Sequence, residues 1–488
     1  MPTASRLDPD ACYRAVASRD RRFDGRFVLA VKTTRVYCRP GCPAPLPKRV
    51  NSLFYPCAAA AEGAGYRPCR RCRPESVAGT PAWAGTSATV SRALRLILDG
   101  ALDDTNVESL ASRVGVGGRH LRRLFAEHLG ASPEAVARTR RVHFARRLID
   151  ETSLPVAQLS ALAGFASLRG FNHAVKETFG RSPTELRRRS HPAPPTRLLA
   201  LRLPYRPPFD WDGLLAYFRL RATPGVELVA DGAYRRTWSL GKERGVLTVS
   251  PVPGENALRL EIAAGPHLVE AVTRASNVFD LDAEPSAIEA QLSKDALLRP
   301  LVRRRSGLRV PGAWDPFELT VRAILGQQVS VQAATTLAGR LAEAFGEDLE
   351  GPAGSPSRLF PAAESLAGRD LTSIGLPSAR ARAISGFAEA VASGRLALSA
   401  PRDLDEHLAR FADLPGIGPW TAHYVALRAF KEPDAFPAGD LGLRRAAARE
   451  GDAPLSEREL AARAEAWRPF RAYAAVHLWT MTPTPETN

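Results

Sequence analysis

Residues 414–420 carry the sequence Leu-Pro-Gly-Ile-Gly-Pro-Trp, which predicts a tight hairpin between two helices. Glycine adopts backbone angles that other residues resist, so Gly416 and Gly418 let successive N–H groups point outward together. Such a row of donors is a cradle for a phosphate. Asp440 follows about twenty residues later, where a new helix is expected to start. This combination suits an enzyme that holds DNA and acts on one nucleotide, which is the hypothesis that the remaining sequence has to support.

The size and charge of the chain agree with that hypothesis. Its 488 residues are too many for one hydrophobic core, so three or four domains are expected. The net charge of +16 favours a polyanionic partner, nucleic acid first and an acidic membrane surface second. We find no run of ~18 apolar residues, which a membrane span requires. The first six residues also lack the apolar core of a signal peptide, so we expect a soluble cytoplasmic protein.

Four segments differ in their residue pattern. Apolar residues at three- and four-residue spacing predict helices, and short alternating runs bounded by Gly or Pro predict strands. The runs expected to form strands are 198–203, 225–229, 246–252 and 257–262, and the segments expected to be linkers are 79–86 and 187–195. Together with the motifs and family resemblances given in the following paragraphs, these patterns predict a multidomain, mainly α fold with α+β parts: a small four-cysteine zinc domain at 1–78, an all-α tandem helix-turn-helix domain at 87–190, a small antiparallel β-sheet domain at 197–284, and all-α helix-hairpin-helix domains at 285–488.

An internal repeat lies in the arginine-rich block. Leu-Gly-Ala-Ser-Pro at residues 129–133 recurs as Phe-Gly-Arg-Ser-Pro at residues 179–183. Each copy follows two short predicted helices around a glycine-containing turn, the second helix basic, which is the pattern of a helix-turn-helix. An ordinary helical bundle with a cationic face is the alternative, but two tandem units are more specific than one.

This block resembles the DNA-binding domain of AraC-type transcription regulators. The resemblance rests on Gly164, Phe165, Ser167, Phe171 and Lys176 at the family's spacing. Where the family has a phenylalanine the chain has a valine, at position 175, and this apolar change should still pack. The resemblance implies promoter DNA and RNA polymerase as partners, with recognition helices at 119–129 and 168–179. The residues expected to face DNA are Arg119, His120, Arg122, Arg123, Arg169 and Asn172.

All six cysteines fall within the first 72 residues. In a chain expected to be cytoplasmic, such clustering argues for metal or thiol chemistry rather than disulfides. Cys12 and Cys57 are expected to be small core residues. The other four form two closely spaced pairs of the kind that tetrahedral Zn²⁺ favours, Cys38 with Cys42 and Cys69 with Cys72. A zinc knuckle that only holds a small domain together is the alternative to a reactive site.

Residues 27–42 and 65–72 are similar to the N-terminal domain of Ada, and the likeness covers nearly all of residues 8–76. In that family the first cysteine accepts a methyl group from a methylated DNA phosphotriester. The resemblance implies that Cys38 is the nucleophile and that one zinc ion is held by Cys38, Cys42, Cys69 and Cys72. Bound zinc would keep the sulfur as thiolate, the nucleophilic form.

Methylation of Cys38 would also change the charge of this centre. Four thiolates on Zn²⁺ carry a net charge of −2, and one thioether reduces it to −1, so the methylated protein should bind DNA more tightly. We therefore predict a one-shot methyl sensor that activates transcription. The Ada family also repairs O6-methylguanine through a Pro-Cys-His-Arg motif; no cysteine follows Cys72, so that activity is not expected.

Residues 197–484 resemble AlkA-type 3-methyladenine DNA glycosylases along essentially their whole length. Matching stretches include 208–211, 307–312, 323–330 and 467–473, besides the hairpin and Asp440. These enzymes belong to the helix-hairpin-helix superfamily, whose members flip a damaged nucleotide out of the duplex and hydrolyse its N-glycosidic bond. Asp440 corresponds to the family's catalytic carboxylate. A role as helix N-cap is the alternative, and both can coexist, because the cap position favours the ionised form that stabilises a cationic sugar or orients water.

The same resemblance implies an aromatic base pocket formed by Trp420, Tyr424 and Trp479, whose rings can stack on an electron-poor alkylated base. Ordinary helical core is the alternative role of these rings. Bifunctional members of the superfamily carry a Schiff-base lysine at the position of Trp420, so strand cleavage is not expected here. The hairpin carbonyls around residues 414, 416 and 417 are a candidate site for a monovalent cation, as in family members.

Gln328 stands where some AlkA-type enzymes insert an apolar wedge into the DNA. Its amide can fill the gap and hydrogen-bond the orphan base. Together the resemblances predict an enzyme that releases alkylated purines and is fused to a methylphosphotriester-sensing activator of the adaptive response, located on the bacterial nucleoid. A transcription regulator with a degenerate, DNA-binding-only glycosylase half is the alternative. Asp440, the hairpin and the aromatic set favour the enzyme.

Overall fold

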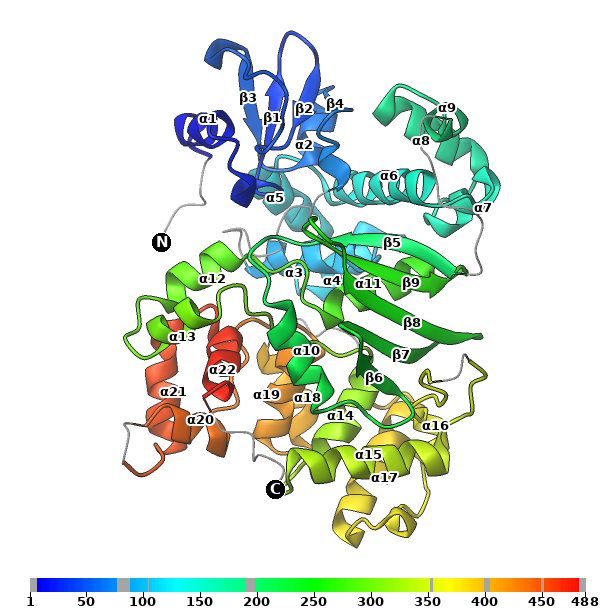
Figure 1. Cartoon of the computed structure of the whole chain (residues 1–488), viewed down its shortest axis with the longest axis vertical. Helices are drawn as coiled ribbons and strands as arrows, with labels where there is room; N and C mark the ends of the chain where they lie inside the picture. Colours follow the sequence, from blue (N-terminus) through cyan, green and yellow to red (C-terminus); the bar gives the residue numbers. More distant parts are fainter. Residues whose placement is uncertain are drawn as a thin grey trace. The chain divides into compact units, whose positions relative to one another are not determined.

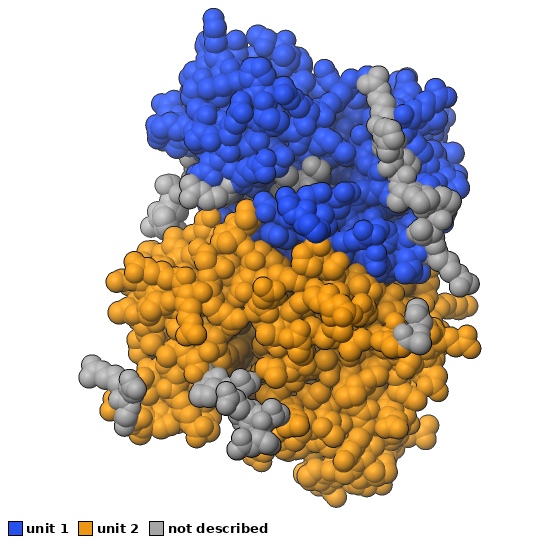
Figure 2. Space-filling model, in the orientation of Figure 1, with its two compact units in different colours: residues 1–206, 252–273, 281–284 blue, residues 207–251, 274–280, 285–488 orange. Residues whose placement is uncertain are grey.

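The computed structural model describes residues 7–76, 88–103, 105–188, 198–351, 354–398, 404–448 and 452–481. The chain divides into two compact units, which Figure 2 shows in different colours. Unit 1 comprises Met1–Arg206, Val252–Thr273 and Leu281–Glu284, and unit 2 comprises Pro207–Pro251, Arg274–Asp280 and Pro285–Asn488. The predicted linker at 79–86, and most of the one at 187–195, lie outside the described residues.

The cysteine-containing part of unit 1 forms a four-stranded sheet with the strand order β3-β1-β2-β4 (Figure 1). Strand β1 pairs antiparallel with β2 and β3, whereas β2 and β4 are parallel. The pairing of Tyr37 with Pro68 brings the ends of β2 and β4 together, and with them Cys38 and Cys69. The elements of this part are α1 (Pro9–Ala17), β1 (Val28–Val31), β2 (Val36–Cys38), β3 (Ser52–Tyr55), α2 (Ala58–Gly63) and β4 (Arg67–Pro68), with 3-10 turns at Arg21–Phe23, Arg49–Asn51 and Pro74–Ser76.

The arginine-rich part of unit 1 is entirely helical, and its two helix-turn-helix units are α4–α5 and α7–α8. The repeated Gly-x-Ser-Pro sequence has a physical reason: Gly130 and Gly180 end α5 and α8 in the left-handed conformation, with φ of 65° and 66°. Ser132 and Ser182 then cap the next helices through their side chains. The helices are α3 (Ala88–Leu98), α4 (Val107–Arg113), α5 (Gly118–Leu129), α6 (Pro133–Glu151), α7 (Val156–Leu162), α8 (Leu168–Phe179) and α9 (Pro183–Arg187). The prediction that Val175 packs is confirmed, because its side chain is fully buried.

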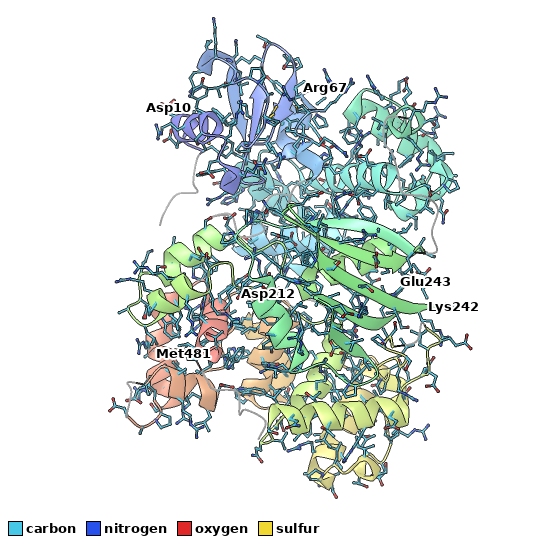
Figure 3. All side chains as sticks on the ribbon, viewed as in Figure 1. Asp10, Arg67, Asp212, Lys242, Glu243 and Met481 are labelled. Atoms are coloured by element: carbon cyan, nitrogen blue, oxygen red, sulfur yellow. The ribbon has the colours of Figure 1, made fainter. Side chains whose placement is uncertain are left out.

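The segment 197–284 is shared between the two units. In unit 1, β5 (Leu198–Pro204) pairs antiparallel with β9 (Ala257–Ala263). In unit 2, β6 (Glu227–Ala230), β7 (Ala233–Leu240) and β8 (Glu243–Pro251) form an antiparallel meander, and Figure 3 labels Lys242 and Glu243 at its second turn. All four predicted strands are present, and β7 was not predicted. The helices α10 (Trp211–Arg219) and α11 (Leu268–Val278) belong to the same segment.

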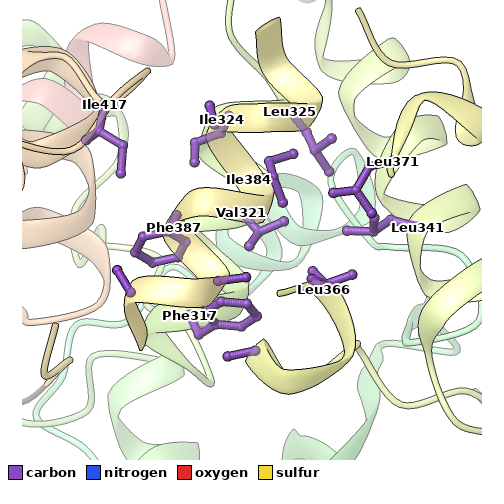
Figure 4. Close-up of a cluster of buried hydrophobic side chains, with 14 of the residues drawn as sticks. Phe317, Val321, Ile324, Leu325, Leu341, Leu366, Leu371, Ile384, Phe387 and Ile417 are labelled. Atoms are coloured by element: carbon purple, nitrogen blue, oxygen red, sulfur yellow. The ribbon is translucent and has the colours of Figure 1, made fainter. Parts of the chain in front are cut away.

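The remaining part of unit 2 is helical and surrounds an apolar core. Figure 4 shows part of this core, where Phe317 stacks on Phe387 and where Ile417 of the hairpin is inserted. The buried Ile417 therefore fixes the hairpin to the core. The helices are α12 (Pro285–Leu292), α13 (Leu298–Arg304), α14 (Pro316–Leu325), α15 (Val331–Phe345), α16 (Ala363–Leu366), α17 (Ser378–Ala392), α18 (Leu404–Ala412), α19 (Pro419–Arg428), α20 (Leu441–Ala446), α21 (Glu457–Ala464) and α22 (Arg471–Trp479), with 3-10 turns at Thr372–Ile374 and Glu465–Trp467. None of the described helices combines the length and the hydropathy needed to cross a membrane.

Candidate functional site

The predicted hairpin joins α18 to α19. Gly416 has a φ of 81°, and a Cβ atom there would lie 2.5 Å from the Cβ of Ala383, so this position requires glycine. Gly418 instead has a φ of −90° and caps α19, in a conformation open to any residue. The expectation that both glycines need unusual backbone angles is therefore wrong for Gly418. The hairpin is also tied to the loop before α15, because Gln327 Nε2 donates to the carbonyl of Gly416 over 2.8 Å.

Asp440 is the N-cap of α20, and its carboxylate is held by three donors. Oδ1 accepts from the backbone N–H of Leu443 at 2.9 Å and from the indole Nε1 of Trp479 at 3.2 Å. Oδ2 accepts from the indole Nε1 of Trp420 at 2.9 Å. Two indole N–H groups thus orient a half-buried carboxylate from two different helices, α19 and α22. Hydrogen bonds of this kind fix the direction of the carboxylate.

Tyr424 completes the aromatic group beside this carboxylate. Its ring stacks on Trp420, with ring centroids 5.0 Å apart and an interplanar angle of 12°, and meets Trp479 edge-on at 6.1 Å. The structure therefore brings together Asp440 and all three aromatic residues that the sequence suggested. Each of these three residues is only partly buried.

Two further residues beside Tyr424, Arg428 and Tyr217, were not predicted from the sequence. Arg428 lies one helical turn after Tyr424 on α19 and donates to its phenol oxygen over 2.6 Å. Tyr217, on α10, contacts the same phenol oxygen at 3.3 Å. The four-residue spacing of Tyr424 and Arg428 is a signal that could have been read, because such residues are neighbours on a helix. Nothing in the sequence connects Tyr217 with a residue 207 positions away.

Gln328 lies at an exposed point of the loop between α14 and α15. Its φ of 57° is rare for a residue with a side chain. The loop is anchored to α17, because Arg380 Nη2 donates to the carbonyl of Gln327 over 2.6 Å. The exposed side chains of Val329 and Val331 flank the point. The loop therefore presents an amide with apolar neighbours to solvent.

The four cysteines of the two pairs lie together, and all four are buried. Their sulfur atoms are within 4.8 Å of one another. A tetrahedral zinc ion with Zn–S bonds of ~2.3 Å places its sulfur ligands ~3.8 Å apart, so this donor set fits zinc. The buried carboxylate of Asp24 holds the turn between the first two cysteines, because it accepts from Gly41 N at 2.8 Å and from Arg39 Nη1 at 2.9 Å. Cys12 and Cys57 are buried elsewhere in the described part of this segment, as expected.

The helices expected to recognise DNA are α5 and α8. Five of the six residues named from the sequence are exposed on them: Arg119, His120, Arg123, Arg169 and Asn172. Arg122 is only half exposed, and its guanidinium is paired with Glu108 and Glu134 at 3.0 Å each. Arg122 therefore links α5 to α4, the other helix of the first helix-turn-helix unit, and to α6, which follows the unit.

A polar cluster connects the cysteine-containing sheet to α6. The carboxylate of Glu62 accepts from Tyr37 Oη at 2.9 Å and from Thr139 Oγ1 at 2.7 Å, and lies 2.9 Å from His143 Nε2. Burial disfavours both charges, but the ion pair outweighs it: the pKa of Glu62 is lowered and that of His143 is raised. Tyr37 directly precedes Cys38, so this cluster begins one residue from the cysteine centre.

Four models of known protein families match successive parts of the chain. The model described as "Metal binding domain of Ada" matches residues 11–75, and "Helix-turn-helix domain" matches 110–189. "AlkA N-terminal domain" matches 200–315, and "HhH-GPD superfamily base excision DNA repair protein" matches 321–472.

Individual relatives give the same result. The chain is 42% identical to "Probable bifunctional transcriptional activator/DNA repair enzyme AlkA" of Mycobacterium tuberculosis, over 98% of this chain and 97% of the relative. It is 36% identical to "DNA-3-methyladenine glycosylase 2" of Escherichia coli, over 57% of this chain and 95% of the relative. The fold resembles that of a 3-methyladenine DNA-glycosylase from Archaeoglobus fulgidus, with a TM-score of 0.52 at 23% identity, over 58% of this chain and 98% of that one. The chain therefore belongs to the family of AlkA-type bifunctional transcriptional activators and DNA repair enzymes.

Proposed function

We propose that the chain is a monofunctional DNA glycosylase that releases alkylated purines of the 3-methyladenine and 7-methylguanine type, joined to an activator of transcription that senses methylphosphotriesters. The observation that best supports the enzyme is the Asp440 carboxylate, held by two indole N–H groups beside the stacked rings of Trp420 and Tyr424. The 36% identity to an Escherichia coli 3-methyladenine glycosylase supports the substrate class.

The reaction needs one carboxylate. An N-alkylated purine carries a positive charge, so when the C1′–N bond breaks the electron pair neutralises the base and no general acid is required. The sugar is left as a cation, which the ionised Asp440 stabilises at short range. Water then adds to C1′, and Asp440 orients it and accepts its proton. The aromatic faces of Trp420, Tyr424 and Trp479 suit a flipped cationic base, through stacking and cation–π attraction.

Base release without strand cleavage follows from the same site. A lyase requires an amine nucleophile that forms a Schiff base with C1′. Trp420 occupies the position of that amine in bifunctional relatives, and its indole N–H is engaged with Asp440. The product is therefore an intact strand with an abasic site.

The hairpin and the loop of Gln328 are proposed to hold the DNA. Backbone N–H groups at Gly416 and Gly418 would bind a phosphate, and Gln328 would fill the gap left by the flipped nucleotide. A monovalent cation at the hairpin carbonyls remains part of the proposal. The carbonyl of Gly416 already accepts from Gln327, and that of Leu414 accepts from the backbone N–H of Ile417, so the carbonyl of Ile417 is the better candidate for it.

Cys38 is proposed as the methyl acceptor. Its Sγ attacks the methyl carbon of a DNA methylphosphotriester, the C–O bond breaks, and the phosphate leaves as a diester anion. Cys38, Cys42, Cys69 and Cys72 would hold Zn²⁺, which keeps the attacking sulfur deprotonated when bound. Loss of one negative charge at Cys38 reduces repulsion of DNA phosphates, which supports tighter binding through α5 and α8. Promoter DNA and RNA polymerase are the proposed partners, in the cytoplasm on the nucleoid.

One pair of assays tests both activities. Duplexes with 3-methyladenine, 7-methylguanine or hypoxanthine are incubated with wild-type protein and with Asp440→Asn; we expect release by wild type, and retained DNA binding without release by the variant. Binding without release by the wild type would favour the alternative of a regulator with a degenerate glycosylase half. Methyl-labelled phosphotriester DNA should label wild type and Cys12→Ala but not Cys38→Ala. Equal labelling of Cys38→Ala would remove Cys38 from this role.

A further inference from the structure

Arg428 is a buried arginine whose hydrogen bonds join main-chain carbonyls to one side chain of the candidate active site, Tyr424. Its side chain is 5% exposed. Nε donates to the carbonyl of Pro311 at 2.7 Å, Nη2 donates to the carbonyl of Gly312 at 3.0 Å, and Nη1 donates to the phenol oxygen of Tyr424 at 2.6 Å. A planar guanidinium is the only side chain that offers three donors in one rigid fork. The guanidinium is therefore fixed by two main-chain carbonyls and positions Tyr424.

A continuous set of contacts connects Arg428 to the carboxylate of Asp440. The ring of Tyr424 stacks on that of Trp420, and Trp420 Nε1 donates to Asp440 Oδ2. A rotation of the Tyr424 ring would remove the surface on which Trp420 rests, and a rotation of Trp420 would withdraw one of the two indole donors. Arg428 itself makes no hydrogen bond to Asp440 among those that the structure describes.

The surroundings of the phenol support this connection. Arg428 and Arg221 lie over the ring of Tyr217 at 5.2 Å and 4.0 Å, and the hydroxyl of Tyr217 contacts the phenol oxygen of Tyr424 at 3.3 Å. Burial by itself would raise the pKa of Tyr424, but Arg428 and Arg221 lower it below its ordinary value. The phenol oxygen of Tyr424 therefore lies among cationic groups, and it accepts the 2.6 Å hydrogen bond from Arg428 there.

We propose that Arg428 is a positioning residue of the glycosylase site: through Tyr424 and Trp420 it sets the direction of the Asp440 carboxylate. The proposal gives Arg428 no direct contact with the base or the sugar, because its described hydrogen bonds go to main-chain carbonyls and to Tyr424. The proposal rests on the proposed base release for its effect on rate, but its effect on Trp420 can be measured without any reaction.

Unit 2 offers a matched control in Arg309. This arginine is also buried, at 2% exposure, donates to the carbonyls of Gly307 and Pro208, and lies 4.9 Å from the ring centroid of Phe209. Arg309→Met therefore reports the general effect of removing a buried arginine that is bonded to main-chain carbonyls. Tyr234→Phe is the corresponding control for loss of a buried phenol, because its hydroxyl donates to Glu227.

The experiment compares full-length Arg428→Lys, Arg428→Met and Tyr424→Phe with these controls. Single-turnover release of 3-methyladenine should fall about tenfold or more in the first three, because one oriented donor at the reacting charge is lost, while affinity for an abasic-site duplex changes less than about threefold. Arg428→Lys should not restore the rate of base release, since the lysine ammonium lacks the rigid, forked donors of the guanidinium. Should Arg428→Met fail to fold, Tyr424→Phe carries the same test, because only a hydroxyl is removed.

Nitrogen-15 spectra of the indole N–H groups provide the second measurement. The Trp420 resonance, assigned with Trp420→Phe, should shift in Arg428→Met and in Tyr424→Phe. The Trp467 resonance should not, because that indole donates to Asp295 at 2.9 Å and serves as an internal reference. An unmoved Trp420 resonance, or release rates equal to that of Arg309→Met, overturns the proposal. If wild type releases no base, the proposed function fails, and the spectra still decide whether Arg428 positions Trp420.

Discussion

Trp420 and Asp440 are separated by 20 residues and joined by a 2.9 Å hydrogen bond from the indole N–H to Oδ2. Trp420 makes a second contact with its ring, which stacks on the ring of Tyr424. The tryptophan is therefore a donor to the carboxylate and, in the proposed function, also a wall of the base pocket. These two roles can be separated by substitution.

Trp420→Phe keeps an aromatic ring for stacking and removes the donor. We expect single-turnover base release to slow about tenfold, in line with the ~1.5 kcal/mol that a hydrogen bond to a charged group contributes. Trp479→Phe should slow it less, because its bond to Asp440 is longer, at 3.2 Å. Equal rates in wild type and Trp420→Phe would show that the indole N–H does not matter for catalysis. Neither variant should be trapped on DNA by borohydride, since no amine is introduced.

Gly416→Ala and Gly418→Ala differ by two positions and should differ strongly in effect. Alanine at 416 must adopt a φ of 81° and pushes its Cβ against Ala383, so we expect a loss of about 2 kcal/mol in the free energy of unfolding, with weaker DNA binding. Alanine at 418 meets nothing within 4 Å at a φ of −90°, so it should change stability by less than about 0.5 kcal/mol. Thermal unfolding and DNA titration of both variants make the comparison. Similar losses at the two positions would contradict the described hairpin geometry.

Arg236 is buried on β7 between two carboxylates. Its Nη2 lies 2.7 Å from Glu318, and its Nη1 lies 3.8 Å from Glu227. Arg236→Met leaves these carboxylates with less compensation, so the free energy of unfolding should fall by about 3–5 kcal/mol. Adding Glu318→Leu should recover much of the loss, because it removes one of the uncompensated charges. A double variant that is no more stable than Arg236→Met would argue against the ion pair as the cause.

The pair of Glu62 and His143 predicts a pH dependence of stability. The pKa of His143 is raised from 6.5, so its contribution is full below that pH and is lost as the pH rises through the folded value. The pKa of Glu62 is lowered from 4.5, so its contribution is full above that pH and is lost as the pH falls through the folded value. The pair should therefore stabilise most between about pH 4.5 and 6.5.

Denaturation of His143→Gln across that range measures the effect. The difference in the free energy of unfolding between wild type and His143→Gln should be largest between about pH 4.5 and 6.5, and it should decrease toward alkaline pH. His173→Gln is the control, since His173 is 78% exposed and 3.6 Å from its partner Glu177. A difference that does not vary with pH would exclude the ion pair as its source.

Removal of zinc should affect the first segment selectively. We expect one zinc per chain in wild type and in Cys12→Ala, and loss of zinc in Cys69→Ser. A chelator should unfold the four-stranded sheet, whose strands β2 and β4 end at the cysteine centre, and leave base release unchanged. Metal content and near-ultraviolet circular dichroism report the two effects. Zinc retained by Cys69→Ser would contradict the four-sulfur site.

Much of the fold could be predicted because its signals are local. The Gly-x-Ser-Pro repeat marks the same left-handed cap and serine N-cap in both copies. Asp440 precedes a helix by the ordinary rule for N-caps. Strand β7 was missed because Arg236 interrupts its apolar pattern, and only the fold shows that this arginine is buried against Glu318. The boundaries of the four predicted domains remain a prediction, since the two compact units divide the segment 197–284 differently.

The residues of the candidate site could be predicted from the sequence, but the hydrogen bonds between them could not. Asp440 and the three aromatic residues follow from the sequence, yet their hydrogen bonds depend on how α19, α20 and α22 pack. The contact of Tyr217 with Tyr424 spans 207 residues, and that of Glu62 with His143 spans 81. Contacts between residues so far apart produce no local pattern in the sequence, so they could not be predicted from it.

The carboxylate of Glu62 has a consequence for how these modules can be exchanged between proteins. A cysteine-containing domain transplanted without α6 would bury the carboxylate of Glu62 without the imidazole of His143 and without the hydroxyl of Thr139. Such a chimera would start with a stability deficit before any question of signalling arose. Recombination that moves the sensor intact must therefore cut after α6, not in the linker that a sequence would suggest. The inheritable piece is larger than the zinc domain itself.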